Sequence, residues 1–185
     1  MLAAVNAGAA SGDSLQINRK DNSMATLTAW AFPGVGDADA TIEKLKTLQS
    51  QQLITIQDAA VVTWEVGKKK PKTRQLHNLA GAGALGGAFW GMLFGLLFFV
   101  PLLGAAIGAG IGALTGSMTD IGIDDSFIDG VKQKVTPGTS ALFLLTSDAV
   151  QDRIKSEFSG IRAELIASNL SADQEAKLRE VFAED

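Results

Sequence analysis

Residues 75–119 read QLHNLAGAGALGGAFWGMLFGLLFFVPLLGAAIGAGIGALTGSMT, and these 45 consecutive residues carry no formal charge. The 16 basic and 20 acidic residues of the chain all lie outside this stretch. The rest of the chain is therefore roughly a quarter charged, the usual proportion in a globular domain in water. The sequence divides into a normally charged domain and an apolar insert.

The insert has the pattern of a helical hairpin. Leu79–Val100 and Leu102–Met118 are two apolar arms of 22 and 17 residues, separated by Pro101. As helices they extend about 33 and 25 Å, against a hydrocarbon core of roughly 30 Å. Pro101 lacks an N–H and disfavours helix at Val100, so we expect it at the hairpin tip.

Glycines recur at every fourth position on both arms. A glycine costs about 1 kcal/mol relative to alanine in a helix in water, but in lipid it lets helix backbones approach closely. We therefore expect the glycine stripes to pack against protein and the bulky faces to meet lipid. The helix-packing positions are Gly87, Gly91 and Gly95 on the first arm, and Gly104, Gly108, Gly112 and Gly116 on the second.

A hairpin buried inside a water-soluble domain is the alternative to membrane insertion. We expect about 120 remaining residues to be too few to cover two fully apolar helices. An oligomer that pools its hairpins in a shielded interior stays open as an alternative. Membrane insertion is the favoured interpretation.

The flanks of the insert differ in charge. Basic residues precede it, whereas Asp120, Asp124 and Asp125 follow it. Both flanks of a hairpin lie on one side of the membrane, and basic flanks favour the cytoplasmic side. The basic residues are candidates for binding lipid head groups, although a solvated β-turn explains each of them singly. They are Lys68, Lys69, Lys70, Lys72 and Arg74.

The charged part of the chain predicts an α+β fold. Strands are expected at 25–32, 54–66, 72–77 and 140–146, and helices from Asp37 onward and over 124–135. Apart from the insert, this β-α-β-β-α-β order is that of a ferredoxin-like antiparallel sheet backed by two helices. The uninterrupted apolar run at 140–146 favours a central strand covered on both faces.

Three domain regions follow from these patterns. Residues 1–23 are expected to be a flexible extension, 24–78 and 119–185 the ferredoxin-like domain, and 79–118 the glycine-zipper hairpin. A strand at 162–168 is expected to extend a sheet edge, and helices are expected at 148–158 and after Ser171. The last helix has an apolar face for docking on its own domain or on a neighbouring subunit.

Composition excludes several chemistries. The chain has no Cys and one His, so thiol, Fe–S and His-rich centres are excluded, and His77 is expected to be structural. A net charge of −4 argues against nucleic acid as a partner. Gly34-Val35-Gly36, with Asp58 about 20 residues on, lacks the third glycine of a dinucleotide loop. We expect no enzyme activity, cofactor, metal site or small-molecule substrate.

Several segments resemble a widespread bacterial family of predicted membrane proteins of unknown function. They are DAAVVTWE at 58–65, GALGGAFWGMLFGLLF at 83–98, the second glycine run, DIGIDDSFI at 120–128, PGTSALFLL at 137–145 and SADQEAKLREVF at 171–182. The resemblance implies a bacterial, membrane-associated protein and supplies no catalytic motif.

The favoured function is therefore a non-enzymatic, membrane-anchored homo-oligomer that scaffolds or organises membrane. Its soluble domain and both termini are expected on the cytoplasmic side of the inner membrane, with lipid and other copies of the chain as partners. A glycine-zipper pore is one alternative. A soluble ring or cage that shields its hairpins and holds lipid or apolar cargo is another.

Overall fold

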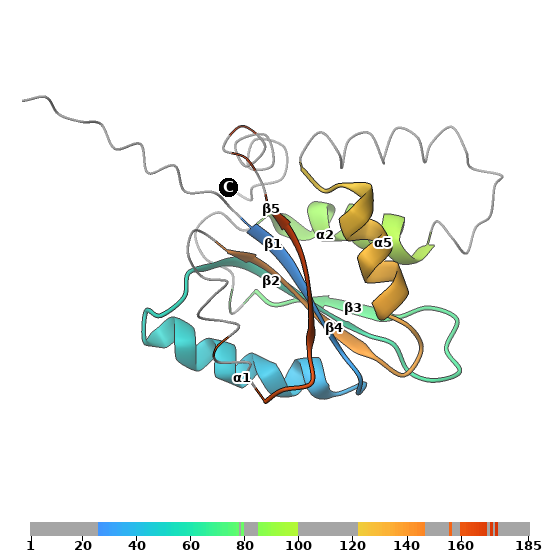
Figure 1. The fold of residues 1–185 in the computed structure, drawn as a ribbon, viewed down its shortest axis with the longest axis horizontal. Helices are drawn as coiled ribbons and strands as arrows, with labels where there is room; N and C mark the ends of the chain where they lie inside the picture. The colour runs from blue at the N-terminus through green and yellow to red at the C-terminus, as the bar shows by residue number, and fades with distance from the viewer. Residues whose placement is uncertain are drawn as a thin grey trace, which may run out of the picture.

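The computed structural model describes residues 26–77, 79, 85–99, 122–146 and 160–169, with single positions at 156, 171 and 173. Its centre is a five-stranded antiparallel sheet in the order β3-β2-β4-β1-β5 (Figure 1). The strands are β1 (Thr26–Phe32), β2 (Ile56–Thr63), β3 (Lys72–Gln75), β4 (Ser140–Thr146) and β5 (Glu164–Asn169).

The central position of β4 confirms the prediction made from its sequence. All seven residues of β4 are buried, and the strand pairs with β1 on one side and β2 on the other. Strand β5 pairs with β1 along the outer edge, as predicted for residues 162–168. The short, charged β3 forms the opposite edge, where its polar side chains discourage pairing with another chain.

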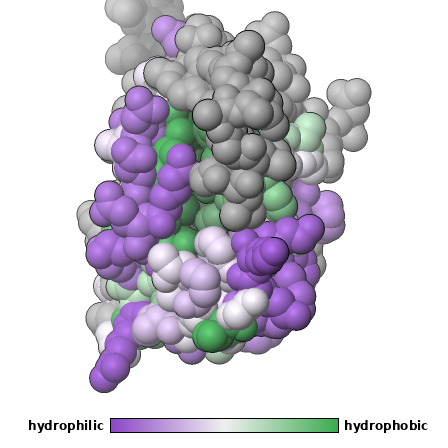
Figure 2. Space-filling model, turned by 90° about the vertical axis from the view of Figure 1, so that its right-hand side faces the viewer, coloured by the Kyte–Doolittle hydropathy of each residue, from purple (hydrophilic) through white to green (hydrophobic). Residues whose placement is uncertain are grey.

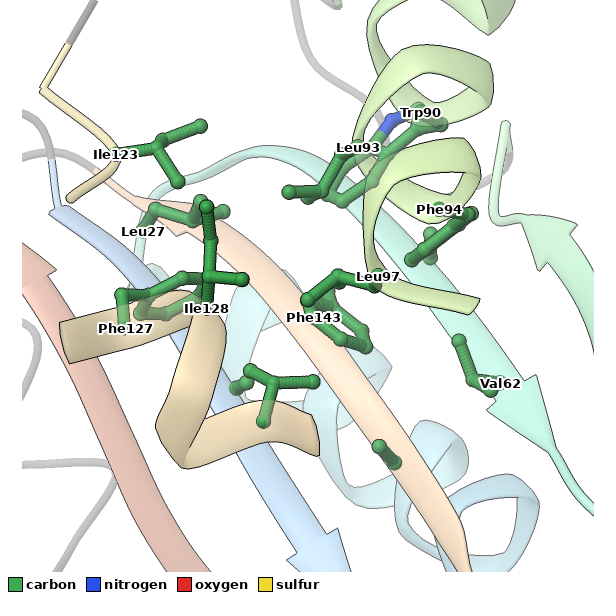
Figure 3. Packing of buried hydrophobic residues seen from close by; sticks show 14 of the residues in the cluster. Leu27, Val62, Trp90, Leu93, Phe94, Leu97, Ile123, Phe127, Ile128 and Phe143 are labelled. Carbon is green, nitrogen blue, oxygen red and sulfur yellow. The ribbon is translucent and has the colours of Figure 1, made fainter. Parts of the chain in front are cut away.

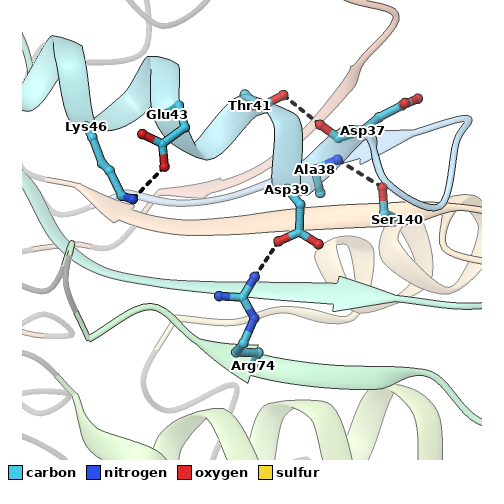
Figure 4. Close-up of polar contacts among 8 residues, drawn as sticks. All are labelled: Asp37, Ala38, Asp39, Thr41, Glu43, Lys46, Arg74 and Ser140. Atoms are coloured by element: carbon cyan, nitrogen blue, oxygen red, sulfur yellow. Dashed lines mark hydrogen bonds and ion pairs between the residues drawn. The ribbon is translucent and has the colours of Figure 1, made fainter.

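Helix α1 (Asp37–Ser50) covers one face of the sheet. Its buried side chains, Ile42, Leu45 and Leu48 among them, pack with apolar residues of β1, β2 and β4. Ser140, at the start of β4, ties the first turn of α1 to the loop before it: its hydroxyl accepts from Ala38 N–H at 3.1 Å and donates to Gly34 C=O at 2.6 Å. The Asp37 carboxylate accepts from Gly34 N–H at 2.9 Å. Figure 4 shows this helix start beside Ser140.

The other face is covered by α2 (Gly86–Phe94), its π-helical continuation η1 (Gly95–Phe99) and α5 (Asp125–Lys134). Side chains from these elements converge on Leu27 and Phe143 of the sheet (Figure 3). Helix α5 has the predicted apolar side, with Phe127, Ile128 and Val131 buried. Asp124 caps its start by accepting from Phe127 N–H at 2.9 Å.

The α+β class is therefore confirmed, but the ferredoxin-like arrangement needs correction. Strands β1 and β2 are parallel to each other with one strand between them, as a split β-α-β unit requires. That middle strand is β4, whereas in a ferredoxin-like sheet it is the hairpin partner of β2. Helices also lie on both faces rather than one, because the central strand β4 is apolar on both sides and each side is covered.

The expected hairpin is not confirmed. In the described part of the chain, no helix reaches the length and mean hydropathy of a membrane span. Residues 85–99 of the first arm form α2 and η1 and pack on the sheet. Outside the described residues lie 1–23, Pro101, Gly104, Gly108, Gly112 and Gly116, as do nearly all residues of the helices expected at 148–158 and after Ser171.

Candidate functional site

The described first arm, residues 85–99, is here called the apolar arm. Its bulky side chains face the sheet: Phe89, Trp90, Leu93, Phe94, Leu97 and Phe98 are each at most 4% exposed. Gly87 and Gly91 lie on the exposed side. No atom of the described structure lies within 4 Å of where a Cβ on Gly87, Gly91 or Gly95 would be. Within the described residues, the bulky face packs on the sheet and the glycine stripe has no neighbour, so packing of the stripe against another helix or another copy stays a prediction.

Aromatic contacts fix the apolar arm on the sheet. Phe143, near the middle of β4, makes an edge contact with Phe94 at 5.2 Å between ring centroids. Trp90 stacks on Phe94 at 5.6 Å, and Phe98 meets the edge of Trp64 at 5.8 Å. Such pairs contribute about 0.5–1.5 kcal/mol each beyond the area they bury. The arm is therefore an integral part of the domain core.

A buried carboxylate holds the start of the apolar arm. Asp58 of β2 is fully buried, and its Oδ2 accepts from Leu85 N–H at 2.8 Å and from Trp90 Nε1 at 3.0 Å. Gln75 Nε2 of β3 donates to both Asp58 oxygens at 3.2 Å. One of these donors, Leu85 N–H, lies at the N-terminus of α2, where a negative charge is favoured. Asp58 thus joins two strands and the arm.

In the sequence, the signal for the role of Asp58 is its place directly before the apolar run AAVV, inside an expected strand. A register irregularity between Ile56 and Asp58 gives β2 the extra residue that sets its side-chain alternation. Asp58 therefore shares a face with Ala60 and Val62, beneath α2. The residue types of β2 do not by themselves predict this irregularity, and so they do not predict which face of the sheet Asp58 lies on.

The connection between β2 and β3, residues 64–71, is here called the lysine loop. Its conformation depends on Trp64, whose Nε1 donates to Lys68 C=O at 2.8 Å. A turn is closed by Lys68 N–H donating to Glu65 C=O at 3.2 Å, with Gly67 at φ +80°. Trp64 N–H and C=O bind Thr139 and Gly138 in the turn before β4. The loop is consequently anchored to the sheet at its base.

The five predicted head-group residues fall into two sets. Lys72 pairs with Glu65 at 2.8 Å, and Arg74 pairs with Asp39 of α1 (Figure 4). The hydrogen bond and charge of Lys72 lower the pKa of the Glu65 carboxyl. Lys68, Lys69 and Lys70 are exposed and form no salt bridge with any residue that the structure describes. These three lysines are the cations available to an anionic partner.

The lysine loop lies beside the end of the apolar arm. Lys70 Nζ is 5.8 Å from the ring centroid of Phe99, a cation–π distance. A hollow of about 330 Å³ is lined by Thr63, Glu65, Pro71 and the loop lysines, and Val66 at the loop tip is 78% exposed. Seen from this side of the molecule, hydrophilic groups border a band of hydrophobic ones (Figure 2). Basic and apolar groups are thus brought together at one place.

The other candidates considered from the sequence do not come together as a site. Within the described ranges, no group of three His, Asp or Glu residues is placed to hold a metal ion. His77 is exposed beyond β3, and Asp124 serves as a helix cap whose pKa is lowered by hydrogen bonds from Ser126 and from Phe127 N–H. The Gly34 and Ala38 N–H groups already have partners within the domain.

Comparison with known families adds one result. Residues 84–183, more than half of the chain, match the model of a family described as a protein of unknown function, DUF1269. The chain belongs to this family. The DUF1269 match covers the apolar arm, α5, β4 and β5, whereas Asp58 and the lysine loop precede it. No curated protein and no solved structure matches the chain. The predicted membership of an uncharacterised family is confirmed.

Proposed function

We propose that this DUF1269 protein is a non-enzymatic protein that attaches to the cytoplasmic face of the bacterial inner membrane. There it assembles with copies of itself as a structural, membrane-organising unit. The observation that carries the proposal is the position of the lysine loop, with Lys70 against Phe99. Phe99 is followed by 20 further residues without a charge, 100–119. Cations and an apolar segment therefore meet at one point of the domain.

This combination matches the chemistry of an anionic membrane surface. Each basic residue near such a surface contributes about 1 kcal/mol, and apolar side chains add to this by entering the hydrocarbon region. Lys68, Lys69 and Lys70 supply the charge, and Val66 supplies an exposed apolar tip between Trp64 and the lysines. The exposed glycine stripe of the apolar arm supports self-assembly, because small residues allow close approach of a second backbone.

The length of the uncharged segment limits how deep it can reach. Phe99 packs against the core cluster that contains Ile123, so the chain between these two residues starts and ends at the domain. Twenty residues divided between two helical directions extend at most about 15 Å, half of a hydrocarbon core. We therefore expect shallow insertion from the packed state, rather than the full crossing expected from arms of 22 and 17 residues.

A second candidate is an assembly that shields its apolar surface without a membrane. Its support is the burial of the bulky face of the apolar arm under the chain's own sheet. We had expected about 120 residues to be too few to cover two fully apolar helices, and the sheet covers the bulky face of the first arm over residues 85–99. In this candidate, residues 100–119 of several copies share one interior.

Vesicle flotation tests the proposal. The full chain is floated with vesicles of phosphatidylglycerol and phosphatidylcholine, and with phosphatidylcholine alone. Replacing Lys68, Lys69 and Lys70 with Gln removes about 3 kcal/mol of attraction, so the affinity for anionic vesicles falls by about 100-fold. The control replaces Lys44, Lys46 and Lys132 with Gln, which removes the same charge from α1 and α5.

The control variant is expected to bind almost as tightly as the parent. Equal binding by the loop variant and the parent contradicts attachment through the lysine loop, and an equal loss in both variants shows a net-charge effect only. A parent chain that fails to float, but runs as a closed particle of many copies, favours the shielded assembly.

A further inference from the structure

We propose that the apolar arm is a releasable strap, latched to the sheet by the Asp58 carboxylate, whose release transfers its aromatic face from the sheet to lipid. The part of this proposal that concerns lipid rests on the proposed function. The latch, which is the pair of hydrogen bonds from the arm to Asp58, rests on contacts within the domain. Release would expose Phe89, Trp90, Leu93, Phe94, Leu97 and Phe98, all of which are buried in the packed state.

The polar attachment of the arm is concentrated on one carboxylate group. Leu85 N–H, at the start of α2, and Trp90 Nε1, one turn further on, both donate to Asp58 Oδ2. Among the contacts of the described residues, apolar packing on the sheet and the cation–π contact of Lys70 on Phe99 also hold the arm. Apolar packing is non-directional and is recovered when the same side chains enter lipid. The hydrogen bonds to Asp58 are lost on release.

Glycines in left-handed backbone conformations lie at the start of the arm and just before α5. Gly86 at the start of α2 has φ +72°, and Gly122 just before α5 has φ +88°. The arm also ends in the π-helical turn η1, a rare geometry that is frequent at functional sites. Glycines at both ends provide the backbone freedom that a hinged segment needs.

Release also changes how deep the segment can reach. With the arm packed, the 20 uncharged residues 100–119 reach about 15 Å out and back as helices. With the arm free, the 34 uncharged residues 86–119 provide 17 in each direction, or about 25 Å as helices. That length approaches the roughly 30 Å hydrocarbon core. Asp58 thus separates a shallow state from a nearly membrane-spanning one.

Thiol labelling in water tests the latch without any membrane. The chain has no Cys, so Leu97→Cys on the arm and Leu142→Cys under α1 each give a single buried thiol, on opposite faces of the sheet. Adding Asp58→Ala is expected to accelerate labelling of the arm thiol by at least ~10-fold, because local opening no longer breaks those hydrogen bonds. Labelling at position 142 is expected to change by less than ~3-fold.

Equal acceleration at both positions overturns the proposal, because it means that Asp58 supports only the global fold. No acceleration at position 97 also overturns it. Trp90→Phe removes one of the two hydrogen bonds and keeps an aromatic ring, so it is expected to give an intermediate acceleration. It keeps the test decisive if Asp58→Ala does not fold.

Vesicle binding then separates the latch from the proposed function. Asp58→Ala is expected to bind anionic vesicles several-fold more tightly than the parent. Leu45→Ala, which destabilises the opposite face of the sheet, is expected to show no such gain. If both variants gain equally, the latch is refuted. If the lysine-loop variant keeps full binding, the attachment mode fails while the labelling result for Asp58 stands.

Discussion

The apolar arm is part of the folded core, and replacing Leu93 with Ala tests this directly. Leu93 is fully buried between α2 and the sheet, in the cluster that contains Phe143 and Leu27 (Figure 3). If the arm packs on the sheet in water, removing this side chain leaves a cavity at the centre of the domain. If the arm instead faces lipid, the free energy of unfolding of the sheet domain does not depend on Leu93.

The expected loss combines two effects. Full burial of a leucine side chain contributes about 1.5–3 kcal/mol of transfer free energy. The cavity left by incomplete relaxation raises the cost of Leu→Ala to about 2–5 kcal/mol. We expect about 3 kcal/mol for Leu93→Ala, since Phe89 and Phe143 of the same cluster are also fully buried. This loss is a large share of the ~5–15 kcal/mol that stabilises a typical domain.

Urea unfolding followed by circular dichroism measures the effect. At a slope of about 2 kcal/mol/M, the midpoint is expected to fall by ~1.5 M. Gly91→Ala is the matched control, two residues away on the exposed side of the same helix, where a methyl group meets open space. It is expected to raise stability by up to about 1 kcal/mol through helix propensity. A change below ~0.5 kcal/mol for Leu93→Ala refutes packing of the arm on the sheet.

Three further predictions concern α5, its pH dependence and assembly. Asp124→Ala removes the cap on α5 and is expected to lower the unfolding free energy by about 1 kcal/mol, measured by urea titration. Because the folded pKa of Asp124 lies below its ordinary value near 3.8, this difference is present above that value and disappears as the pH falls through the folded pKa. Gly91→Leu is expected to keep or raise the unfolding free energy, by up to about 1 kcal/mol, and to reduce the mass of the assembly seen by light scattering. An unchanged mass contradicts packing through the glycine stripe.

The strands and α5 could be predicted because local patterns and tertiary environment agree. The continuous apolar run at 140–146 requires burial on both faces, and the structure places β4 between β1 and β2 with helices on both sides. Asp124 followed by Phe127, Ile128 and Val131 combines a cap with an apolar face. For β4 and α5, the local sequence pattern and the observed burial therefore agree.

The position of the apolar arm could not be predicted for a physical reason. Phe89, Leu93 and Phe94 form a bulky stripe that suits lipid and a protein core equally well. Hydropathy measures the avoidance of water and not the nature of the partner. The deciding information is the open sheet face around Phe143, which exists only once β1, β2 and β4 have paired.

The basic site could be predicted only in part, because the sequence does not show which basic residues form ion pairs in the folded domain. Five cations within seven residues formed one expected head-group site, yet Lys72 and Arg74 are paired with acidic residues. Asp39 lies 35 residues from Arg74 in the sequence, so that pairing depends on how α1 crosses the sheet. Exposed ion pairs of this kind contribute little stability but reduce the charge available to a partner.

The most direct test of membrane attachment is the depth of a spin label on the lysine loop. Val66 and Leu53 are the two large apolar side chains that the described structure exposes, and they give matched labelling sites as Val66→Cys and Leu53→Cys. With anionic vesicles, the account predicts that the label at Val66 becomes accessible to oxygen and protected from a water-soluble nickel complex. The label at Leu53 is predicted to stay in water. Equal accessibility of the two labels in the presence of bound vesicles contradicts attachment through the lysine loop.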